Sequence, residues 1–425
     1  MSVDIPDSGT LLGFVPTAQY GDEIDTDRLS DVPVDLGSAQ QGARGGALHI
    51  SSVLPALSAA IGTPVRTDVH VDAEGLRQRL GMPCARSAIV VLVDGLGYWN
   101  LNMKLGYAPY MRSLMNEPLN QRPISTCSPS TTTAAMATFG TGTCPGLTGM
   151  AGYTQLNPRT GALSQLIQFR GAMHPEELQT EPTVFSLIRD AGNRATSVGL
   201  TRFMASPLTR AALRGSDYIG HDDANKRVRI AADTAKEPGL TYLYMREIDK
   251  AGHAYGWHSD EWQVALERVD MRLGQLRRQV PKGTLIVVIA DHGMVTADQG
   301  DEARIDIALD PVLQQGVRLV GGEPRATMLY AQDGVDDESI AERWRARVGD
   351  RAWIRTKRQV IDCGLLGPMR PDVPEMLGDV FVYAARGNTI VDTRSQTEGA
   401  TRMPGVHGSQ TMMEMDVPCL IDLVD

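Results

Sequence analysis

The sequence predicts an α/β fold with a mostly parallel central sheet flanked by helices on both faces, and a smaller inserted α+β lobe. Three continuous runs of apolar and β-branched residues are typical of strands that are buried on both faces. Helical patterns occur between and after them, and such alternation indicates a parallel sheet. The strand runs are residues 88–93, 240–244 and 285–290, and the helical patterns are residues 183–191, 260–278 and 338–348.

The order of these patterns divides the 425-residue chain into three parts. Residues 1–46 show no sustained period and are predicted to be an N-terminal arm, disordered or draped over the surface. Residues 47–292 and 404–425 are predicted to form the main α/β domain. Residues 293–403 carry shorter, mixed patterns and are predicted to be the inserted lobe, with strands at 325–330, 380–383 and 388–391.

Composition excludes several classes of protein. A formal net charge of −10 disfavours binding to a nucleic-acid polymer, which depends on clustered Lys and Arg. The first residues lack the basic and apolar regions of a signal peptide, and every apolar run is far shorter than the roughly 20 residues that span a bilayer. Five cysteines without a C-x-x-C pair are typical of reduced thiols. We therefore expect a cytoplasmic protein with no membrane span, and its oligomeric state stays open.

Metal-ligand side chains directly follow two of the predicted strands. Asp94 comes after the first strand, and Asp291 with His292 comes after the third. In parallel sheets, ligands bind outside the carboxyl ends of the strands, where these side chains are expected to lie. Zinc accepts both carboxylate and imidazole ligands. For Asp94 alone, capping of the next turn is an equally good interpretation.

Two further segments add ligands of the same kind. Asp249 and His253 are four residues apart and would face the same way on a helical turn. An exposed ion pair is the ordinary alternative for this spacing. His407 lies in a glycine-rich segment, residues 405–408, whose backbone can take unusual angles and aim the ring.

A hydroxyl-rich turn at residues 128–134 leads into an apolar helical pattern. Ordinary helix capping by Ser or Thr explains part of this composition. The same position also suits a nucleophile, because free N–H groups at a helix start can hold a phosphoryl oxygen. A metal ion can lower the pKa of the hydroxyl enough to make it an attacking group.

Six segments together resemble the alkaline phosphatase superfamily, and the best match is its type I phosphodiesterase and nucleotide pyrophosphatase branch. They are VLVDG at 91–95, PSTTTA at 129–134, TGTCP at 141–145, DKAGH at 249–253, ADHG at 290–293 and GVHG at 405–408. The resemblance runs from about Leu48 to the C-terminus. In that family the nucleophilic Thr precedes the Thr-Gly of a T-G-x-x-P segment by nine residues, which points to Thr132.

The resemblance implies an alkaline phosphatase-like fold and two zinc ions, although Mn²⁺ or Fe could fill the same ligands. One ion would be held by Asp249, His253 and His407, and the other by Asp94, Asp291, His292 and Thr132. It also implies in-line attack by Thr132, a covalent phosphothreonine intermediate and net retention at phosphorus. The implied activity is hydrolysis of a phosphodiester or phosphoanhydride in a small nucleotide-like substrate. Phosphomonoesterase and phosphonate hydrolase activities are alternatives, and a catalytically silent relative is a third.

The chain departs from this family at the substrate. Nucleotide pyrophosphatases carry an Asn about twenty residues after the nucleophile, and Tyr153 stands in that place here. We expect its hydroxyl, or the backbone N–H of Thr133, to hold a phosphoryl oxygen instead. Phe139, Phe203 and Tyr255 are candidates for contact with a nucleobase, and core packing is the alternative for each.

Overall fold

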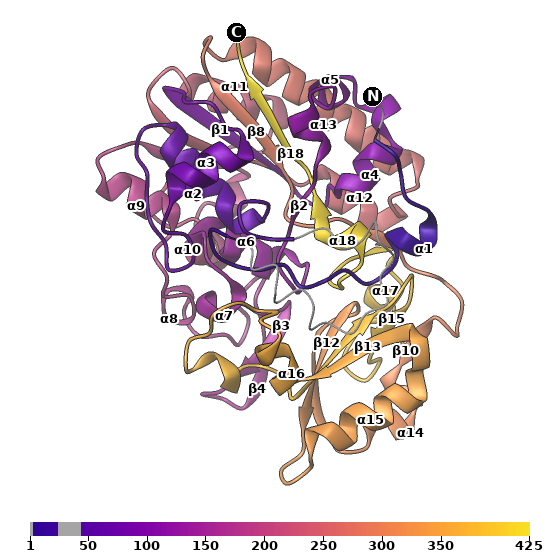
Figure 1. The fold of residues 1–425 in the computed structure, drawn as a ribbon. Coiled ribbons are helices and arrows are strands. Elements are labelled where there is room, and N and C mark those ends of the chain that lie inside the picture. Colours follow the sequence, from indigo (N-terminus) through magenta and orange to yellow (C-terminus); the bar gives the residue numbers. More distant parts are fainter. Residues whose placement is uncertain (1–2, 24–43) are drawn as a thin grey trace.

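The computed structural model describes residues 3–23 and 44–425. A larger α/β part carries both ends of the chain, and a smaller part with its own sheet lies at the far end (Figure 1). All five cysteines are free. No helix among the described residues is long and apolar enough to cross a membrane.

The central sheet confirms the predicted mostly parallel α/β fold. Its strand order is β18-β8-β1-β7-β5-β6, in which β18 alone runs antiparallel to its neighbour. The strands are β1 (Ser87–Val93), β5 (Ala195–Gly199), β6 (Asp217–Gly220), β7 (Gly239–Met245), β8 (Leu285–Ile289) and β18 (Cys419–Leu423). Every residue of β1 and β8 is buried, because helices cover both faces of the sheet.

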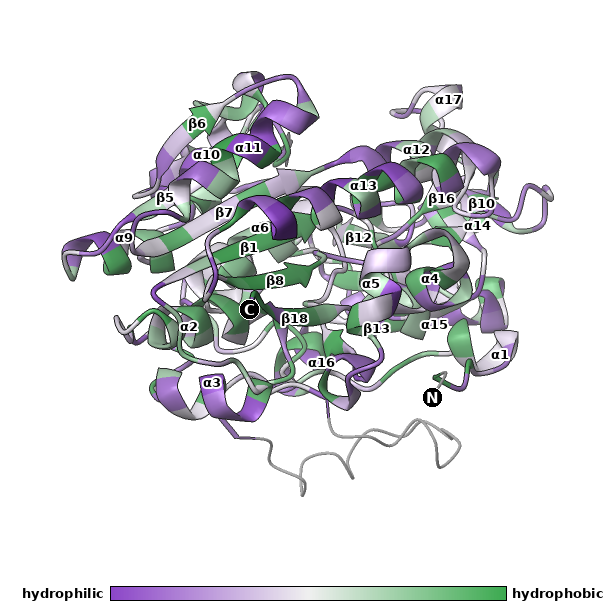
Figure 2. Cartoon of the chain, turned by 90° about the horizontal axis from the view of Figure 1, so that it is seen from above, coloured by the Kyte–Doolittle hydropathy of each residue, from purple (hydrophilic) through white to green (hydrophobic). Residues whose placement is uncertain are grey.

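Helices form a layer on each face of this sheet. Figure 2 shows α11 and α13 on one side and α2 and α3 on the other. The first layer comprises α5 (Pro109–Leu114), α11 (Ala224–Thr234), α12 (Glu247–Tyr255) and α13 (Asp260–Gln279), and the second α2 (Ile50–Ala60), α3 (Ala73–Leu80), α6 (Thr132–Thr141), α9 (Val184–Asp190) and α10 (Pro207–Ala212). Helix α13 begins where the Ser259 side chain accepts from the N–H of Trp262, and its buried stripe includes Leu266 and Leu273.

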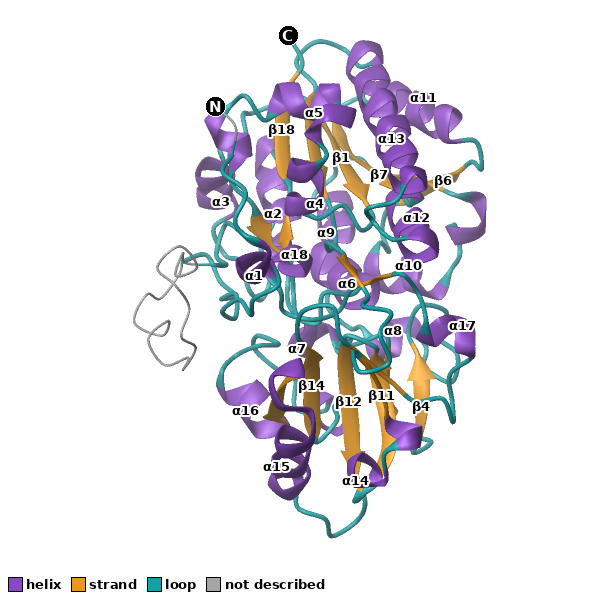
Figure 3. Cartoon of the chain, turned by 90° about the vertical axis from the view of Figure 1, so that its right-hand side faces the viewer, coloured by secondary structure: helices purple, strands orange, loops and turns teal. Residues whose placement is uncertain are grey.

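The smaller part is built on a four-stranded antiparallel sheet in the order β11-β12-β14-β13 (Figure 3). Its strands are β11 (Val317–Glu323), β12 (Ala326–Ala331), β13 (Ala352–Thr356) and β14 (Val380–Ala384). Helix α15 (Asp337–Val348) packs on it through Ile340 and Trp344. The predicted strand at 388–391 is β15 (Thr389–Val391). It does not belong to the four-stranded sheet and pairs with β10 (Arg304–Asp306).

A hairpin from outside the predicted lobe also packs on this sheet. It consists of β3 (Thr154–Asn157) and β4 (Ala162–Gln165). Leu156 and Leu163 of the hairpin belong to the same apolar cluster as Tyr330 of β12, whose hydroxyl accepts from the N–H of Leu156 at 2.9 Å. The smaller part therefore draws on two separate segments of the chain, and the lobe boundaries at 293 and 403 stay a proposal.

Short elements complete the two parts. They are α1 (Ser8–Leu11), α4 (Tyr98–Met103), β2 (Ile124–Ser125), α7 (Pro145–Thr148), α8 (Pro175–Leu178), β9 (Val295–Thr296), α14 (Pro311–Gln314), α16 (Lys357–Asp362), α17 (Glu398–Thr401), β16 (Gly405–Val406), α18 (Met412–Met415) and β17 (Asp416–Val417).

The described residues of the N-terminal arm pack against the rest of the protein. Val15 is fully buried and its N–H donates to the carbonyl of Gln410 at 2.9 Å. The Phe14 ring lies edge-on to Trp353 of β13 at 4.7 Å between ring centroids. Residues 11–18 thus tie the smaller sheet to a segment of the α/β part just beyond His407. Residues 24–43, which carry much of the predicted arm, lie outside the described residues.

Candidate active site

The strand order brings three carboxylates to one edge of the central sheet. Strand β1 lies between β7 and β8, so the residues that follow these three strands are neighbours. Asp94 follows β1, Asp249 lies in α12 just after β7, and Asp291 follows β8. The N–H of Asp249 donates to the carbonyl of Asp94 at 3.0 Å, and the N–H of Gly95 donates to Asp291 Oδ1 at 3.1 Å. Backbone hydrogen bonds therefore fix the spacing of the cluster.

Asp249, His253 and His407 form the first group of ligand atoms, all within 4.8 Å of one another. His253 Nε2 lies 3.1 Å from Asp249 Oδ1 and 3.3 Å from His407 Nε2. The Nδ1 atoms of both rings donate to backbone carbonyls, that of Gly405 at 2.8 Å and that of Ser130 at 2.9 Å. Both Nε2 lone pairs therefore face the same carboxylate, an arrangement that suits a shared cation.

Asp94, Asp291 and His292 form the second group, again within 4.8 Å. His292 Nε2 lies 3.6 Å from Asp94 Oδ1 and 3.5 Å from Asp291 Oδ2. Its Nδ1 faces the carbonyl of Gly293 at 3.0 Å, which leaves Nε2 as the ligand atom. Thr132 Oγ1 is 3.2 Å from the same Nε2, so its hydroxyl faces this group.

The charges of the site call for cations. One oxygen each of Asp94, Asp249 and Asp291 is buried without a hydrogen-bond donor among the described residues. Burial, together with the carboxylates of Asp291 and Asp249, raises the pKa of Asp94 well above its usual range. Burial and the other two imidazoles lower the pKa of His407, which keeps its ring in the neutral form that binds metals. Uncompensated buried carboxylates are costly, and bound divalent cations would offset their negative charge.

The donor chemistry fits two divalent metal ions. The first group offers one carboxylate and two imidazoles, and the second offers two carboxylates, one imidazole and the Thr132 hydroxyl. Zinc binds all of these ligand types, and manganese and iron also accept carboxylate and imidazole. The structure thus brings together all seven residues that the sequence singled out as ligands.

Thr132 is the first residue of α6, and Thr131 is its N-cap. The first N–H of this helix with a backbone acceptor is that of Ala135, which donates to the carbonyl of Thr131 at 2.9 Å. The N–H groups of the first three helical residues, 132–134, have no acceptor among the described residues. A helix start with free N–H groups beside a hydroxyl can hold an anionic phosphoryl group.

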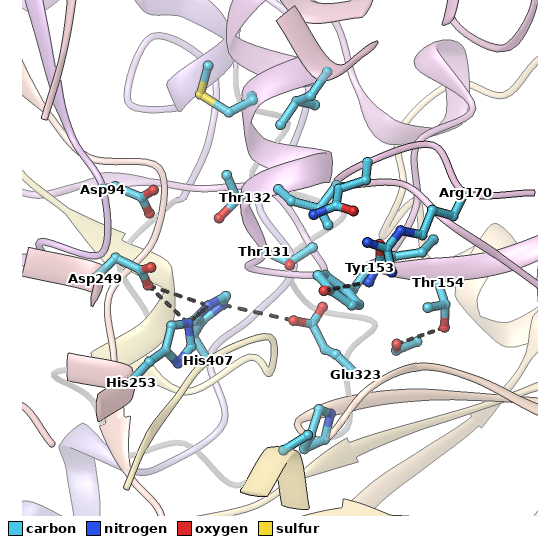
Figure 4. A pocket seen from close by; sticks show the side chains of 18 of the residues that line it. Asp94, Thr131, Thr132, Tyr153, Thr154, Arg170, Asp249, His253, Glu323 and His407 are labelled. Atoms are coloured by element: carbon cyan, nitrogen blue, oxygen red, sulfur yellow. Dashed lines mark hydrogen bonds and ion pairs between the residues drawn. The ribbon is translucent and has the colours of Figure 1, made fainter. Parts of the chain in front are cut away.

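A cavity of about 1190 Å³ opens in front of this helix and passes between the two parts (Figure 4). Metal-ligand residues and Thr132 lie on its α/β side. The aromatic part of that wall comes from Phe203, Tyr218, Tyr242 and Tyr244, and the opposite wall includes Tyr153, Thr154, Leu163, Gln165, Arg170 and Glu323. The Tyr244 hydroxyl donates to Asp94 Oδ2, which ties the aromatic wall to the second ligand group.

The predicted substrate residues have mixed outcomes. Tyr153 and Phe203 line the cavity, and the Tyr153 hydroxyl accepts from Gln165 Nε2 at 2.8 Å. Phe139 is fully buried with its ring 5.8 Å from that of Tyr242, so the prediction of base contact is wrong for this residue. Tyr255 is 58% exposed and is not among the residues that line this cavity, so base contact by this residue stays a prediction.

Thr133 does not line the cavity, because its buried hydroxyl donates to the carbonyl of Gly152 at 2.8 Å. Its backbone N–H is the group that could reach substrate. The cavity wall on the lobe side also includes Glu323, Gln165 and Arg170, which no pattern in the sequence singles out. They follow no local motif, since only the docking of the second sheet places them at the cavity.

Comparisons with known proteins agree with this geometry. The type I phosphodiesterase / nucleotide pyrophosphatase family matches residues 88–410. An uncharacterized pyrophosphatase/phosphodiesterase of Schizosaccharomyces pombe is 28% identical over 112 residues, which cover 25% of this chain and only 22% of that protein.

Two solved structures share the fold. Murine ectonucleotide pyrophosphatase/phosphodiesterase 5 superposes with a TM-score of 0.61 at 18% identity, covering 79% of this chain and 87% of that one. Phosphonoacetate hydrolase from Sinorhizobium meliloti, in complex with phosphonoformate, gives a TM-score of 0.60 at 21% identity, covering 80% and 90%. The family match spans most of the chain. The protein therefore belongs to the type I phosphodiesterase / nucleotide pyrophosphatase family.

Proposed function

We propose that this protein is a two-metal phosphodiesterase or nucleotide pyrophosphatase with Thr132 as its nucleophile. The observation that carries this proposal is the position of one hydroxyl. Thr132 Oγ1 lies at a helix start, 3.2 Å from His292 Nε2 of one ligand group, and shares a cavity with the other. A nucleophile beside two cation sites is the arrangement needed for in-line phosphoryl transfer.

The side chains divide the chemistry between them. When bound, two zinc ions supply positive charge to the phosphoryl group and lower the pKa of a coordinated hydroxyl. In the first step Thr132 Oγ1 bonds to phosphorus while the P–O bond to the leaving oxygen breaks, and the hydroxyl proton leaves to water so that the departing alcohol or nucleotide can be protonated in turn. In the second step water attacks the covalent phosphothreonine ester, the Thr132–phosphorus bond breaks, and the phosphate product and the free hydroxyl are released. The free N–H groups of α6 bind a phosphoryl oxygen throughout, and the Tyr153 hydroxyl on the opposite wall is a further donor.

The size and lining of the cavity support a diester or anhydride over a simple monoester. A volume of about 1190 Å³ leaves room for a second, larger group beside the phosphate. Phe203 and Tyr218 provide flat apolar surface for a nucleobase. A solved structure of the murine relative is described as an inactive threonine-to-alanine variant in complex with AMP, which supports both a nucleotide ligand and an essential threonine.

A comparison of three substrates tests this proposal. We would measure zinc-supported hydrolysis of thymidine 5′-nitrophenyl phosphate, nitrophenyl phosphate and phosphonoacetate, each with a chelator-treated control. We expect a large preference for the diester that chelation abolishes. A preference for nitrophenyl phosphate would make the protein a phosphomonoesterase, and a preference for phosphonoacetate would make it a phosphonate hydrolase. Diester hydrolysis that survives exhaustive chelation would contradict the two-metal proposal.

A further inference from the structure

A buried carboxyl group on the lobe wall of the cavity has no part in either ligand group. Glu323 is the last residue of β11, is 8% exposed and lines the cavity. Its Oε1 is buried without a hydrogen-bond partner among the described residues. Figure 4 shows its carboxyl group between His407 and Tyr153, close to Thr131 and facing the side of the cavity that holds Thr132.

The surroundings of Glu323 leave this oxygen available to a ligand. Its Oε2 is 4.0 Å from His407 Nδ1, but that nitrogen already donates to the carbonyl of Ser130. The nearby guanidinium of Arg325 is used by Glu414, with contacts of 3.0 and 2.7 Å. Neither Arg325 nor any other Lys or Arg among the described residues forms an ion pair with Glu323. An uncompensated buried carboxyl group is costly, so a partner from the substrate would relieve a real deficit.

The fold holds this carboxyl group in place. A Cβ atom at Gly408 would lie 2.9 Å from Cδ of Glu323, so the backbone after His407 packs directly against it. Gly408 itself has a φ of +131°, a conformation that disfavours any side chain. Glu323 therefore has little freedom to turn away from the cavity.

The chemistry of a carboxylate decides what it can meet. The free oxygen of this group accepts hydrogen bonds, and a carboxylate would repel phosphoryl oxygens. A suitable partner is therefore a hydroxyl or an ammonium group. Tyr153, on the same wall, accepts from Gln165 and keeps its own proton free to donate. That proton serves a phosphoryl oxygen in the proposed function, so Glu323 is the group of this wall that would meet the substituent.

We propose that Glu323 is a specificity residue that selects phosphodiesters whose second ester group carries a hydroxyl or ammonium hydrogen-bond donor. This inference rests on the proposed phosphodiesterase function and deepens it. A hydroxyl and an ammonium group can both donate a hydrogen bond to a carboxylate. They differ in charge, so matched substrates and variants can show which of the two Glu323 prefers.

Three matched esters test the inference. We would measure kcat/KM of the zinc-loaded enzyme for nitrophenyl phosphodiesters with propyl, 3-hydroxypropyl and 3-aminopropyl groups, corrected for self-cleavage without enzyme. We expect at least one donor-bearing ester to exceed the propyl ester by about 10-fold or more, the usual scale of a hydrogen bond to a charged group. Glu323→Ala should bring that ratio close to one. Glu323→Gln keeps an acceptor oxygen without the charge, so it should retain a hydroxyl preference and lose an ammonium preference.

The control is Asp362→Ala, which removes a carboxylate of the same lobe that is 72% exposed and should leave the ratios at wild-type values. Equal kcat/KM for all three esters in the wild type would overturn the inference about Glu323 and leave the proposed function standing. The same conclusion would follow if Glu323→Ala slowed hydrolysis of all three esters equally and left the ratios unchanged. If Glu323→Ala does not fold, Glu323→Gln decides the question. An ammonium preference that persists in Glu323→Gln would contradict a contact with a charged carboxylate. Loss of a hydroxyl preference in Glu323→Gln would contradict the role of hydrogen-bond acceptor. No hydrolysis of any ester by the wild type would overturn the proposed function, and the inference with it.

Discussion

The two walls of the cavity are built in different ways. On the α/β side, Asp94, Asp249 and Asp291 follow three adjacent strands, and backbone hydrogen bonds fix their separation. On the lobe side, Tyr153 precedes a hairpin strand and Glu323 ends a strand some 170 positions later, so the two come together only when the hairpin packs on the second sheet. The reactive groups thus depend on local strand ends, whereas the substrate wall depends on how two parts of the chain dock. We expect mutations on the two walls to have separable effects.

The largest expected effect lies on the α/β wall. Thr132→Ala removes the hydroxyl that faces His292 and should reduce kcat by about 10³-fold or more, because a nucleophile cannot be replaced by its neighbours. Metal content, measured by elemental analysis, should change little. Thr160→Ala, in the exposed hairpin turn, is the control. Full activity in Thr132→Ala would assign the attack to Thr131, Thr133 or water.

The next effect tests the connection between the two walls. Phe14→Ala should lower the free energy of unfolding by about 3–5 kcal/mol, because the ring is 4% exposed and packs against Trp353 of the lobe. Urea denaturation followed by circular dichroism measures this loss. Ile5→Ala, at a position that is 45% exposed, should cost far less. Equal stability of the two variants would mean that the N-terminal segment does not hold the parts together.

Metal removal should destabilise the α/β wall. Free zinc at 100 times its dissociation constant should raise the free energy of unfolding by about 2.7 kcal/mol for each independent site. The reason is that cations would pair with three carboxylates, each of which has one oxygen without a hydrogen-bond donor among the described residues. Thermal unfolding with and without chelator measures the change, and Asp249→Asn should abolish binding of one ion of the two. Identical unfolding curves with and without chelator would contradict the metal assignment.

A smaller effect is expected on the lobe wall. Tyr153→Phe removes a hydroxyl that bonds Gln165 at 2.8 Å and should lower kcat/KM for the thymidine diester by about 10-fold, the scale of one hydrogen bond. Metal content should stay at the wild-type level. Tyr107→Phe, an exposed tyrosine, serves as the control. A loss of metal in Tyr153→Phe would show that the two walls are not separable.

The sequence predicts the α/β wall well because its signals are local. Buried parallel strands are continuous apolar runs, and the residue after each run lies at the ligand-binding edge. Of the two interpretations that the sequence allows for Phe139, base contact and core packing, the structure has core packing. Phe139 lies seven residues along α6, which carries it about 10 Å from the start of the helix.

Apart from Tyr153, which its spacing from Thr132 singles out, the lobe wall and the N-terminal segment leave no signal in the sequence. Glu323 reaches the cavity only because β11 docks beside His407, and no spacing in the sequence encodes that contact. Residues 14–18 have no period because they pack without a helix between two parts of the molecule. Contacts of this kind depend on tertiary structure and leave no local pattern.

The stereochemical course at phosphorus tests the central claim most directly. A chiral phosphorothioate diester would be hydrolysed by the zinc-loaded enzyme in ¹⁸O-labelled water, and the configuration of the product would be determined. Two successive in-line displacements, the first by Thr132 and the second by water, predict retention. Inversion would show a single displacement by water, and it would contradict Thr132 as the nucleophile.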